Sequence, residues 1–388
     1  MPLRFAAALA LTLLVGCATS SSIFVAPELR PSRVVADTLA RDSVREARKR
    51  VRVLLIGDAG APRLDSPDPV LSLLRRHAIS ADSTPTVVVF LGDNVYPEGI
   101  PAAGHPGREL AEARLRAQLD AVKDLPVRTY FVPGNHDWAH SKPGGLTAVR
   151  RQEAIVEAAL GERGGFIPSN GFPGPVAVEL AEGIQMLAID TEWWLTPFER
   201  AMGEDEEAGY TVREGNDFLL QLNDIVQEFD DDRVLVVGHH PLVSNGSHAG
   251  NVPPSRHFFP LLGKVDWGYI PLPILGSLSV LYTRTFGLSR EDIGHPRYLS
   301  LRDGLEGIFR QHEGIIYAAG HDHSLQVHAL DYGGVTVHQL ISGSGPHASF
   351  TPGGGTALFT AERKGFLILN YYDDGSADID ALAVGKGE

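Results

Sequence analysis

The chain has 388 residues, of which 43% are hydrophobic and 21% are charged, a composition typical of a globular protein rather than a disordered one. Its formal net charge of -14 at pH 7 argues against nucleic acid or anionic lipid as an electrostatic partner. An anionic substrate would therefore be attracted locally, by metal ions or by some of the 15 histidines.

The first residues have the pattern of an export signal. Arg4 provides a short basic region, and Phe5–Val15 forms an apolar stretch too short to span a membrane comfortably. The stretch ends in Leu14-Val15-Gly16-Cys17, with the only cysteine of the chain, and resembles a bacterial lipobox. The resemblance implies cleavage before Cys17 and lipid modification of the new N-terminus. The alternative is a plain secretory peptide, and both interpretations predict an exported chain without a disulfide.

A polar segment separates this signal from the first predicted strand. Residues 18 to about 48 are rich in serine at first and in charged residues later, which is typical of a tether followed by a short polar helix. We therefore expect residues 1–16 to be a lipoprotein signal peptide, 17–48 the tether with its helix, and 49–388 a single folded domain. Lipidated Cys17 would hold the protein on a bacterial membrane, on the periplasmic side of the cell envelope.

Strands and helices alternate through most of the expected domain. Apolar β-branched runs predict strands at 51–56, 86–91, 127–132, 234–237 and 314–319, and helical spacing predicts helices at 69–77, 108–122, 147–160 and 216–229. Strands at 176–180 and 184–190 are joined by Ala181-Glu182-Gly183, a hairpin signal. A β-rich end follows, with strands at 325–330, 335–341, 365–372 and 377–384. This order favours an α/β fold of two packed mixed sheets with helices outside.

The segment 251–312 is interpreted as an insertion between two motifs. Its middle part, 269–286, is apolar but contains Pro271, Pro273 and Gly276, so it is too broken and too short for a membrane span. We expect an irregular cover over the site, or a patch against a partner or the bilayer surface. A small hydrophobic cluster under a long loop is the alternative.

Five motifs follow predicted strands in chain order, each with a glycine before a potential ligand. They are Gly57-Asp58-Ala59-Gly60, Gly92-Asp93-Asn94-Val95-Tyr96, Gly134-Asn135-His136-Asp137, Gly238-His239 and Gly320-His321-Asp322-His323. Because parallel strands end along one edge of a sheet, we expect these side chains to converge. Carboxylate, phenol, amide and imidazole donors suit iron, zinc or manganese. Each motif alone has an ordinary explanation as a turn, a cap or a structural histidine, but the ordered set of five favours a metal centre.

This set resembles the calcineurin-like metallophosphoesterase superfamily, and within it the small, tartrate-resistant type of purple acid phosphatase. Gly60 stands where most of the superfamily has a metal-binding histidine, and Tyr96 stands where most members have no ligand. Gly320-His321-Asp322-His323 followed by Ser324-Leu325-Gln326 is also close to that type. The resemblance covers about residues 50–345 apart from the insertion. It implies a four-layer αββα sandwich of two mixed β-sheets flanked by helices.

The resemblance also implies two metal ions, held by side chains at matching positions. Asp58, Tyr96 and His323 would bind the first ion, Fe(III), whose tyrosinate ligand gives a purple colour. Asn135, His239 and His321 would bind the second ion, which is Fe(II), Zn or Mn, and Asp93 would bridge both. His136 matches the histidine that contacts the phosphate and assists the leaving group. His248, nine residues beyond His239, matches a second substrate-contacting histidine.

The implied activity is acid phosphatase-like hydrolysis of phosphate monoesters on a phosphorylated small molecule, by attack of metal-bound hydroxide. One alternative is a phosphodiesterase or pyrophosphohydrolase acting on nucleotides or envelope lipid precursors. Another is a surface lipoprotein that captures metal or ligand without turnover. Trp193 and Trp194, which follow Asp190, either stack on an organic leaving group or pack under the acidic loop at 199–207.

Replacing Cys17 with serine is expected to release the protein from membranes, because the lipid would be attached through this thiol. The measurement is the distribution of the protein between membrane and soluble fractions, with the unmodified sequence as the reference. Retention of the variant with the membranes would contradict anchoring through Cys17 alone and would point to the segment 269–286.

Overall fold

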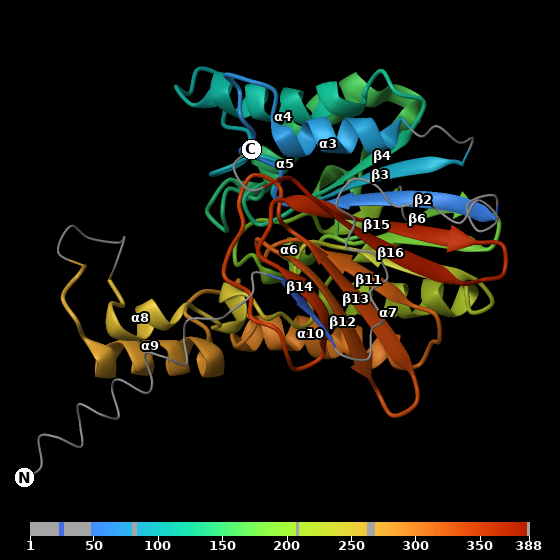
Figure 1. The fold of residues 1–388 in the computed structure, drawn as a ribbon. Helices are drawn as coiled ribbons and strands as arrows, with labels where there is room; N and C mark the ends of the chain where they lie inside the picture. The colour runs from blue at the N-terminus through green and yellow to red at the C-terminus, as the bar shows by residue number, and fades with distance from the viewer. Residues whose placement is uncertain (1–22, 27–47, 80–83, 207–208, 262–267, 386–388) are drawn as a thin grey trace, which may run out of the picture.

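The computed structural model of the chain describes residues 23–26, 48–79, 84–206, 209–261 and 268–385 (Figure 1). The predicted signal peptide, Cys17 and most of the predicted tether lie outside the described residues. Within these residues the strands form two large sheets, of six and eight strands, and a separate two-stranded hairpin.

The six-stranded sheet has four parallel strands in sequence order. They are β2 (Lys49–Ile56), β3 (Thr86–Leu91), β4 (Arg128–Val132) and β5 (Gly164–Phe166). On the other side of β2 lie the antiparallel strands β15 (Gly365–Tyr372) and β16 (Ala377–Ala383). Every residue of β3 is buried, as expected for a strand covered on both faces of the sheet.

The eight-stranded sheet has parallel strands at its centre and antiparallel strands toward both edges. Its order is β1 (Ile23–Val25), β14 (Ala357–Ala361), β12 (Leu325–Asp331), β13 (Thr336–Ser342), β11 (Ile316–Ala319), β10 (Arg233–Val237), β7 (Ile184–Ala188) and β6 (Val176–Ala181). Strands β7, β10, β11 and β13 run parallel. The predicted hairpin is confirmed, because Ala181 lies opposite Ile184 across a tight turn between β6 and β7.

Helices cover the outer face of each sheet (Figure 1). On the six-stranded sheet lie α3 (Pro69–Ala78), α4 (Arg108–Val122) and α5 (Gly145–Leu160); on the eight-stranded sheet lie α7 (Gly215–Glu228) and α10 (Pro296–Phe309). Three buried apolar clusters fill the three spaces between these layers. Along β2, Leu54 faces the helices and Val53 faces the other sheet, which is the two-residue period of a strand. The predicted four-layer αββα sandwich is confirmed.

The predicted insertion at 251–312 is too long at its C-terminal end. Residues Leu301, Leu305 and Phe309 of α10 are buried against the eight-stranded sheet, so α10 is the crossover helix between the parallel strands β10 and β11. The part that projects from the body contains α8 (Pro254–Phe258) and α9 (Pro273–Phe286) (Figure 1). α9 is a regular helix, and the expectation of an irregular cover is wrong.

The tether prediction is also wrong at one place. Ile23–Val25 forms strand β1, which pairs antiparallel with β14 and extends the eight-stranded sheet. The ring of Phe24 lies against Gly353, where a Cβ atom would come within 2.1 Å of it. A short apolar triplet can complete a sheet edge in this way, because its backbone groups pair with an exposed strand.

The remaining elements are short. They are α6 (Thr191–Leu195), the hairpin of β8 (Gly203–Asp205) and β9 (Tyr210–Val212), and the 3-10 turns η1 (Gly161–Arg163), η2 (Ser169–Gly171) and η3 (Ser247–Ala249). No helix among the described residues combines the length and the apolar composition that crossing a bilayer requires.

Candidate metal centre

The five predicted motifs follow five strands from two different sheets. Strands β2 and β3 of one sheet and β10 and β11 of the other each end immediately before a motif glycine, and β4 ends one residue earlier, before Pro133 and Gly134. The ends of these strands meet at one edge of the sandwich. The structure thereby brings together all seven predicted metal ligands, namely Asp58, Asp93, Tyr96, Asn135, His239, His321 and His323.

One group of donor atoms surrounds the phenol of Tyr96. Its Oη lies 3.0 Å from Asp58 Oδ1, 3.1 Å from Asp93 Oδ2 and 3.0 Å from His323 Nε2. His323 Nε2 is also 3.3 Å from Asp58 Oδ1. These are the four side chains that the sequence assigned to the first ion and its bridge, and their donor atoms are close enough to share one cation.

A second group of donor atoms surrounds the imidazole of His239. Its Nδ1 donates a hydrogen bond to the carbonyl of Leu91 at 2.8 Å, so the lone pair of the neutral ring is on Nε2. This Nε2 lies 3.0 Å from Asn135 Oδ1 and 3.4 Å from Asp93 Oδ1. Asp93 therefore presents one oxygen to each group, as the predicted bridging role demands.

His321 completes the second group and has an unsatisfied nitrogen. Its Nε2 donates to the backbone carbonyl of Glu291 at 2.9 Å, which leaves the lone pair on Nδ1. This Nδ1 is buried and has no hydrogen-bond partner among the described residues. A buried acceptor without a hydrogen-bond partner destabilises the folded state. A metal ion would bind this nitrogen, while the carbonyl of Glu291 orients the ring through its other nitrogen.

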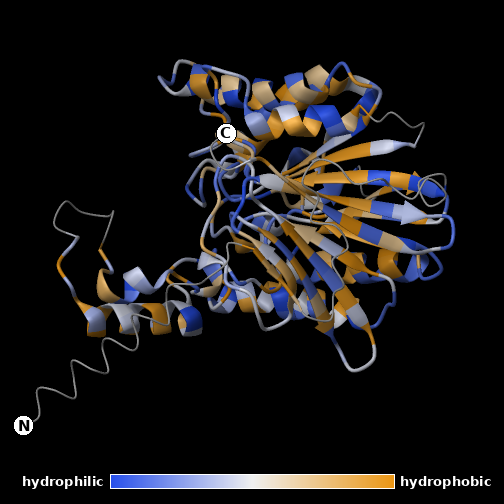
Figure 2. Ribbon diagram, in the orientation of Figure 1, coloured by the Kyte–Doolittle hydropathy of each residue, from blue (hydrophilic) through white to orange (hydrophobic). Residues whose placement is uncertain are grey.

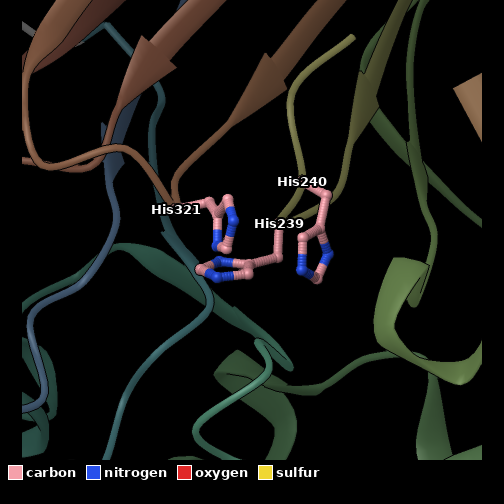
Figure 3. Close-up of side chains that lie close together, drawn as sticks. All are labelled: His239, His240 and His321. Atoms are coloured by element: carbon pink, nitrogen blue, oxygen red, sulfur yellow. The ribbon is translucent and has the colours of Figure 1, made fainter. Parts of the chain in front are cut away.

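His240 lies beside the second group, although the sequence motifs did not single it out. His239, His240 and His321 each offer a ring nitrogen, and these atoms lie within 4.8 Å of one another (Figure 3). The Nδ1 of His240 is 2.8 Å from the hydroxyl of Thr191, and its Nε2 is 3.8 Å from Glu192 Oε2. The doublet of histidines after β10 was the available signal, but sequence alone does not show which ring faces the cluster.

The donor set fits two hard or borderline metal ions. It contains carboxylate, phenol, amide and imidazole groups and no thiolate, which suits iron, zinc or manganese. Burial, and next the negative charges of Asp58 and Asp93, raise the pKa of the Tyr96 phenol well above its usual range. A phenolate at this place therefore requires a strongly positive ion beside it.

Backbone strain accompanies three of the ligand positions. Asp58, Asp93 and His321 have φ values of 57°, 54° and 70°, a left-handed conformation that costs energy for residues with a Cβ atom. The strain is offset by hydrogen bonds inside the site, since the backbone N–H of His321 donates to Asp58 Oδ2 at 2.8 Å. Gly134 is required for space, because a Cβ atom there would lie 2.5 Å from Asp93 Oδ1.

Asp137, the last residue of the third motif, holds the loops after β3 and β4 together. Its buried carboxylate accepts hydrogen bonds from the backbone N–H groups of Asn94, Val95 and Gly134, at 2.8 to 3.2 Å. It also accepts one from the side-chain amide of Asn94. Asp137 is thus a positioning residue for the ligands Asp93 and Asn135, a role that the sequence did not reveal.

Both predicted catalytic histidines lie next to the ligand cluster. His136 Nδ1 donates to the carbonyl of Pro97 at 2.6 Å, and its Nε2 is 3.8 Å from Asp93 Oδ2. The ring of His248 lies against that of His321, with centroids 4.0 Å apart and an interplanar angle of 36°. Its Nδ1 is 3.2 Å from Asp292 Oδ1.

Electrostatics favour the charged form of His248. Burial lowers its pKa, but the hydrogen bond that its ring donates to Asp292 and the charge of Asp322 outweigh burial and raise the pKa to about 9. Asp292 also accepts hydrogen bonds from the backbone N–H groups of Leu288 and Ser289. Asp292 therefore links His248 to the segment that returns from α9.

This returning segment, residues 288–292, brings two groups to the site that the sequence motifs did not predict. The backbone carbonyl of Glu291 orients His321, and the carboxylate of Asp292 orients His248. Two cavities of about 420 and 430 Å³ flank the segment, and Leu288 lines both. The insertion thus reaches the site through its C-terminal end, while α9 projects outward.

The two tryptophans after Asp190 pack inside the protein, so stacking of Trp193 on a substrate is ruled out. Trp193 is fully buried, its Nε1 donates to the carbonyl of Ala201, and the guanidinium of Arg200 lies 4.1 Å above its ring. Trp194 is half-buried and donates to the carbonyl of Arg297. The packing alternative is therefore correct for Trp193, which contacts Arg200 and Ala201 of the acidic loop.

Two carboxylate- and imidazole-rich donor groups that share one aspartate, at the joined strand ends of two sheets, define a candidate two-metal centre of the kind used by metal-dependent hydrolases. The sequence profile of the calcineurin-like phosphoesterases matches residues 51–267, more than half of the chain. The chain belongs to this family. No curated protein sequence matches it.

Several solved structures are similar to this fold at low sequence identity. GAP50, the anchor in the inner membrane complex of Plasmodium, is 18% identical with a TM-score of 0.49, covering 87% of this chain and 86% of that one. A dimetal phosphatase from Danio rerio is 15% identical with a TM-score of 0.43, covering 86% and 96%. PhoD is 10% identical with a TM-score of 0.44, covering 85% and 68%.

Bound metal is expected to stabilise the folded protein, because the donor atoms are gathered only in the native state. A ligand present at about 100 times its Kd adds about 2.7 kcal/mol to the free energy of unfolding. A chelator should therefore lower Tm, and Zn or Fe should restore it. Asp93→Asn should abolish this response, whereas Asp120→Asn, at an exposed carboxylate on α4, should keep it. A Tm that stays the same when either chelator or metal is added would contradict the metal centre.

Proposed function

We propose that the chain is an exported metal-dependent phosphatase of the purple acid phosphatase type, which hydrolyses phosphate monoesters. The observation that carries the proposal is the place of Tyr96, whose phenol oxygen lies within 3.1 Å of Asp58, Asp93 and His323. A phenol amid two carboxylates suits a strongly acidic, trivalent ion, which can stabilise the phenolate. Membership of the phosphoesterase family supplies the reaction class.

Two metal ions, when bound, would neutralise charge on the phosphate and lower the pKa of a water molecule. In this proposal Asp58, Tyr96 and His323 hold Fe(III), Asn135, His239 and His321 hold Fe(II), Zn or Mn, and Asp93 lies between them. Because one carboxylate serves both donor groups, these side chains would hold the two ions at separate positions. This chemistry would require no serine or cysteine nucleophile, because water would attack phosphorus directly.

The two histidines beside the cluster supply the remaining chemistry in this proposal. Because Pro97 holds the Nδ1 of His136, its Nε2 is the nitrogen that contacts the phosphate and protonates the leaving oxygen. His248, oriented through Nδ1 by Asp292, offers its other nitrogen to an equatorial phosphate oxygen. The cavities on either side of residues 288–292 have room for the organic part of a small phosphorylated molecule.

Replacing Tyr96 with phenylalanine is expected to remove the broad visible absorption band of an iron–tyrosinate pair, because only the hydroxyl is lost. The aromatic ring stays, so the fold and most of the metal content should persist. The measurement is a visible spectrum with metal analysis of the parent and variant proteins. An unchanged spectrum, or a parent protein with iron and no band, would contradict the iron–tyrosinate assignment.

Replacing His136 with alanine is expected to lower kcat on p-nitrophenyl phosphate by about 10²- to 10⁴-fold while both metals stay bound. The loss follows from removing the proton donor to the leaving group. His105→Ala is the matched control, since His105 is exposed and its ring nitrogen accepts a hydrogen bond from the nearby backbone N–H of Gly107. Near-normal turnover of the His136 variant would contradict its role.

The preference for monoesters is tested with two substrates. Faster hydrolysis of bis-p-nitrophenyl phosphate than of p-nitrophenyl phosphate by the parent protein would contradict this preference.

A further inference from the structure

Helix α9 exposes an unusual amount of apolar surface. Ile274, Leu278, Leu281 and Phe286 are 55% to 75% exposed, and Leu275 and Tyr282 are also exposed. Figure 2 shows hydrophobic stretches along α9, a helix that stands away from the body of the protein. Contiguous apolar patches of this kind mark interaction surfaces on soluble domains.

The apolar side chains lie on one side of α9. At 3.6 residues per turn, the six exposed positions from Ile274 to Phe286 occupy about 140° of the helix circumference. The opposite side contains Gly276 and Val280, which are buried. A Cβ atom at Gly276 would come within 2.2 Å of the carbonyl of His257 on α8, so α8 covers this inner side. The apolar face therefore points away from the protein.

The charge of this projection is opposite to that of the whole chain. The described residues 251–261 and 268–287 contain Arg256 and Arg284 and no aspartate or glutamate, whereas the chain carries a net charge of -14. Arg284 donates to the carbonyl of Gly250 and to the side-chain oxygen of Asn251, which are neutral acceptors. Arg284 thus adds positive charge to the helix that carries the apolar face.

We propose that α9 docks on the surface of an anionic phospholipid bilayer. Its apolar face would enter the boundary between headgroups and acyl chains, and Arg284, the arginine of α9, would contact a lipid phosphate. An apolar face flanked by basic residues is the signature of a helix that lies in the membrane interface. The overall negative charge, which excluded anionic lipid for the chain as a whole, does not exclude it here because the opposite charges are spatially segregated.

A second copy of the chain is a less suitable occupant of this face. Packing two α9 helices together would bring Arg284 of one copy toward Arg284 of the other with no carboxylate on either helix, and like charges at an interface are unfavourable. An anionic bilayer instead offers an apolar layer for the leucines of α9 and negative phosphates for Arg284.

The position of α9 also agrees with the predicted lipid anchor. The loop between β13 and β14 connects both regions, since Gly353 lies against Phe24 of β1 and Phe350 lines the same cavity as Val280 of α9. Residues 18–22 separate Cys17 from β1, a span of about 20 Å at full extension. A lipid on Cys17 would hold this side of the protein near the bilayer, where a second, weaker contact adds to stable binding.

The test is co-sedimentation of the full chain with lipid vesicles, using Cys17→Ser in every protein so that a lipid anchor does not contribute. The parent should bind vesicles of phosphatidylcholine with phosphatidylglycerol, bind phosphatidylcholine alone more weakly, and dissociate at high salt. The double variant Leu278→Glu, Leu281→Glu should bind about tenfold or more weakly, because two apolar side chains lose their burial in the bilayer.

The matched control is Leu220→Glu, at a leucine of α7 that is 62% exposed and lies outside the projection. This variant should bind like the parent. All variants change exposed side chains, so Tm and turnover of p-nitrophenyl phosphate should be unchanged and a folding defect would be recognised.

Two results would overturn the proposal. Equal vesicle binding by the parent and the double variant would show that α9 is not the contact. The second result is a parent protein that forms dimers in sedimentation velocity without binding vesicles. If the double variant is then monomeric, the face is a subunit interface. Neither result depends on phosphatase activity, so failure of this proposal is distinguishable from failure of the proposed function.

Discussion

The structure depends on one buried carboxylate, that of Asp93, and on the groups that compensate its negative charge. One oxygen accepts from the backbone N–H of His136 and lies near the ring of His239, while the other lies beside Tyr96. These partners follow β4, β10 and β3, so the carboxylate joins loops of both sheets. Because a buried charge without compensation is expensive, the two sheets must bring cationic or hydrogen-bonding groups to this point.

The sandwich meets this requirement through strand direction. Parallel strands at the centre of each sheet end on the same edge, and tight Gly-containing turns place a polar side chain immediately after each strand. The left-handed backbone at Asp58 and His321 is tolerated because hydrogen bonds within the site offset its cost. The apolar layers below this edge are continuous, so the polar groups are held by a rigid scaffold, as pre-organised catalytic sites require.

The insertion contributes to the molecule in two separate ways. Its returning segment, 288–292, ties His321 and His248 to the site through a carbonyl and a carboxylate. Its outward helix α9 instead exposes leucines and carries positive charge. The insertion thus shapes the pocket at its base and exposes an apolar surface at its tip. In these proposals the same segment connects the reaction site with the bilayer surface.

The sequence by itself determined the local structure and the ligand types. Apolar runs such as Thr86–Leu91 predicted the buried strands, and a glycine at the start of each motif predicted the turns, because both depend on residues adjacent in the chain. Only the tertiary structure decided the rest. The contact of Asp292 with His248, the burial of Trp193 and the pairing of Ile23–Val25 with β14 depend on segments distant in sequence. Burial and pairing between distant segments leave no local periodicity, so only packing of the whole chain determines them.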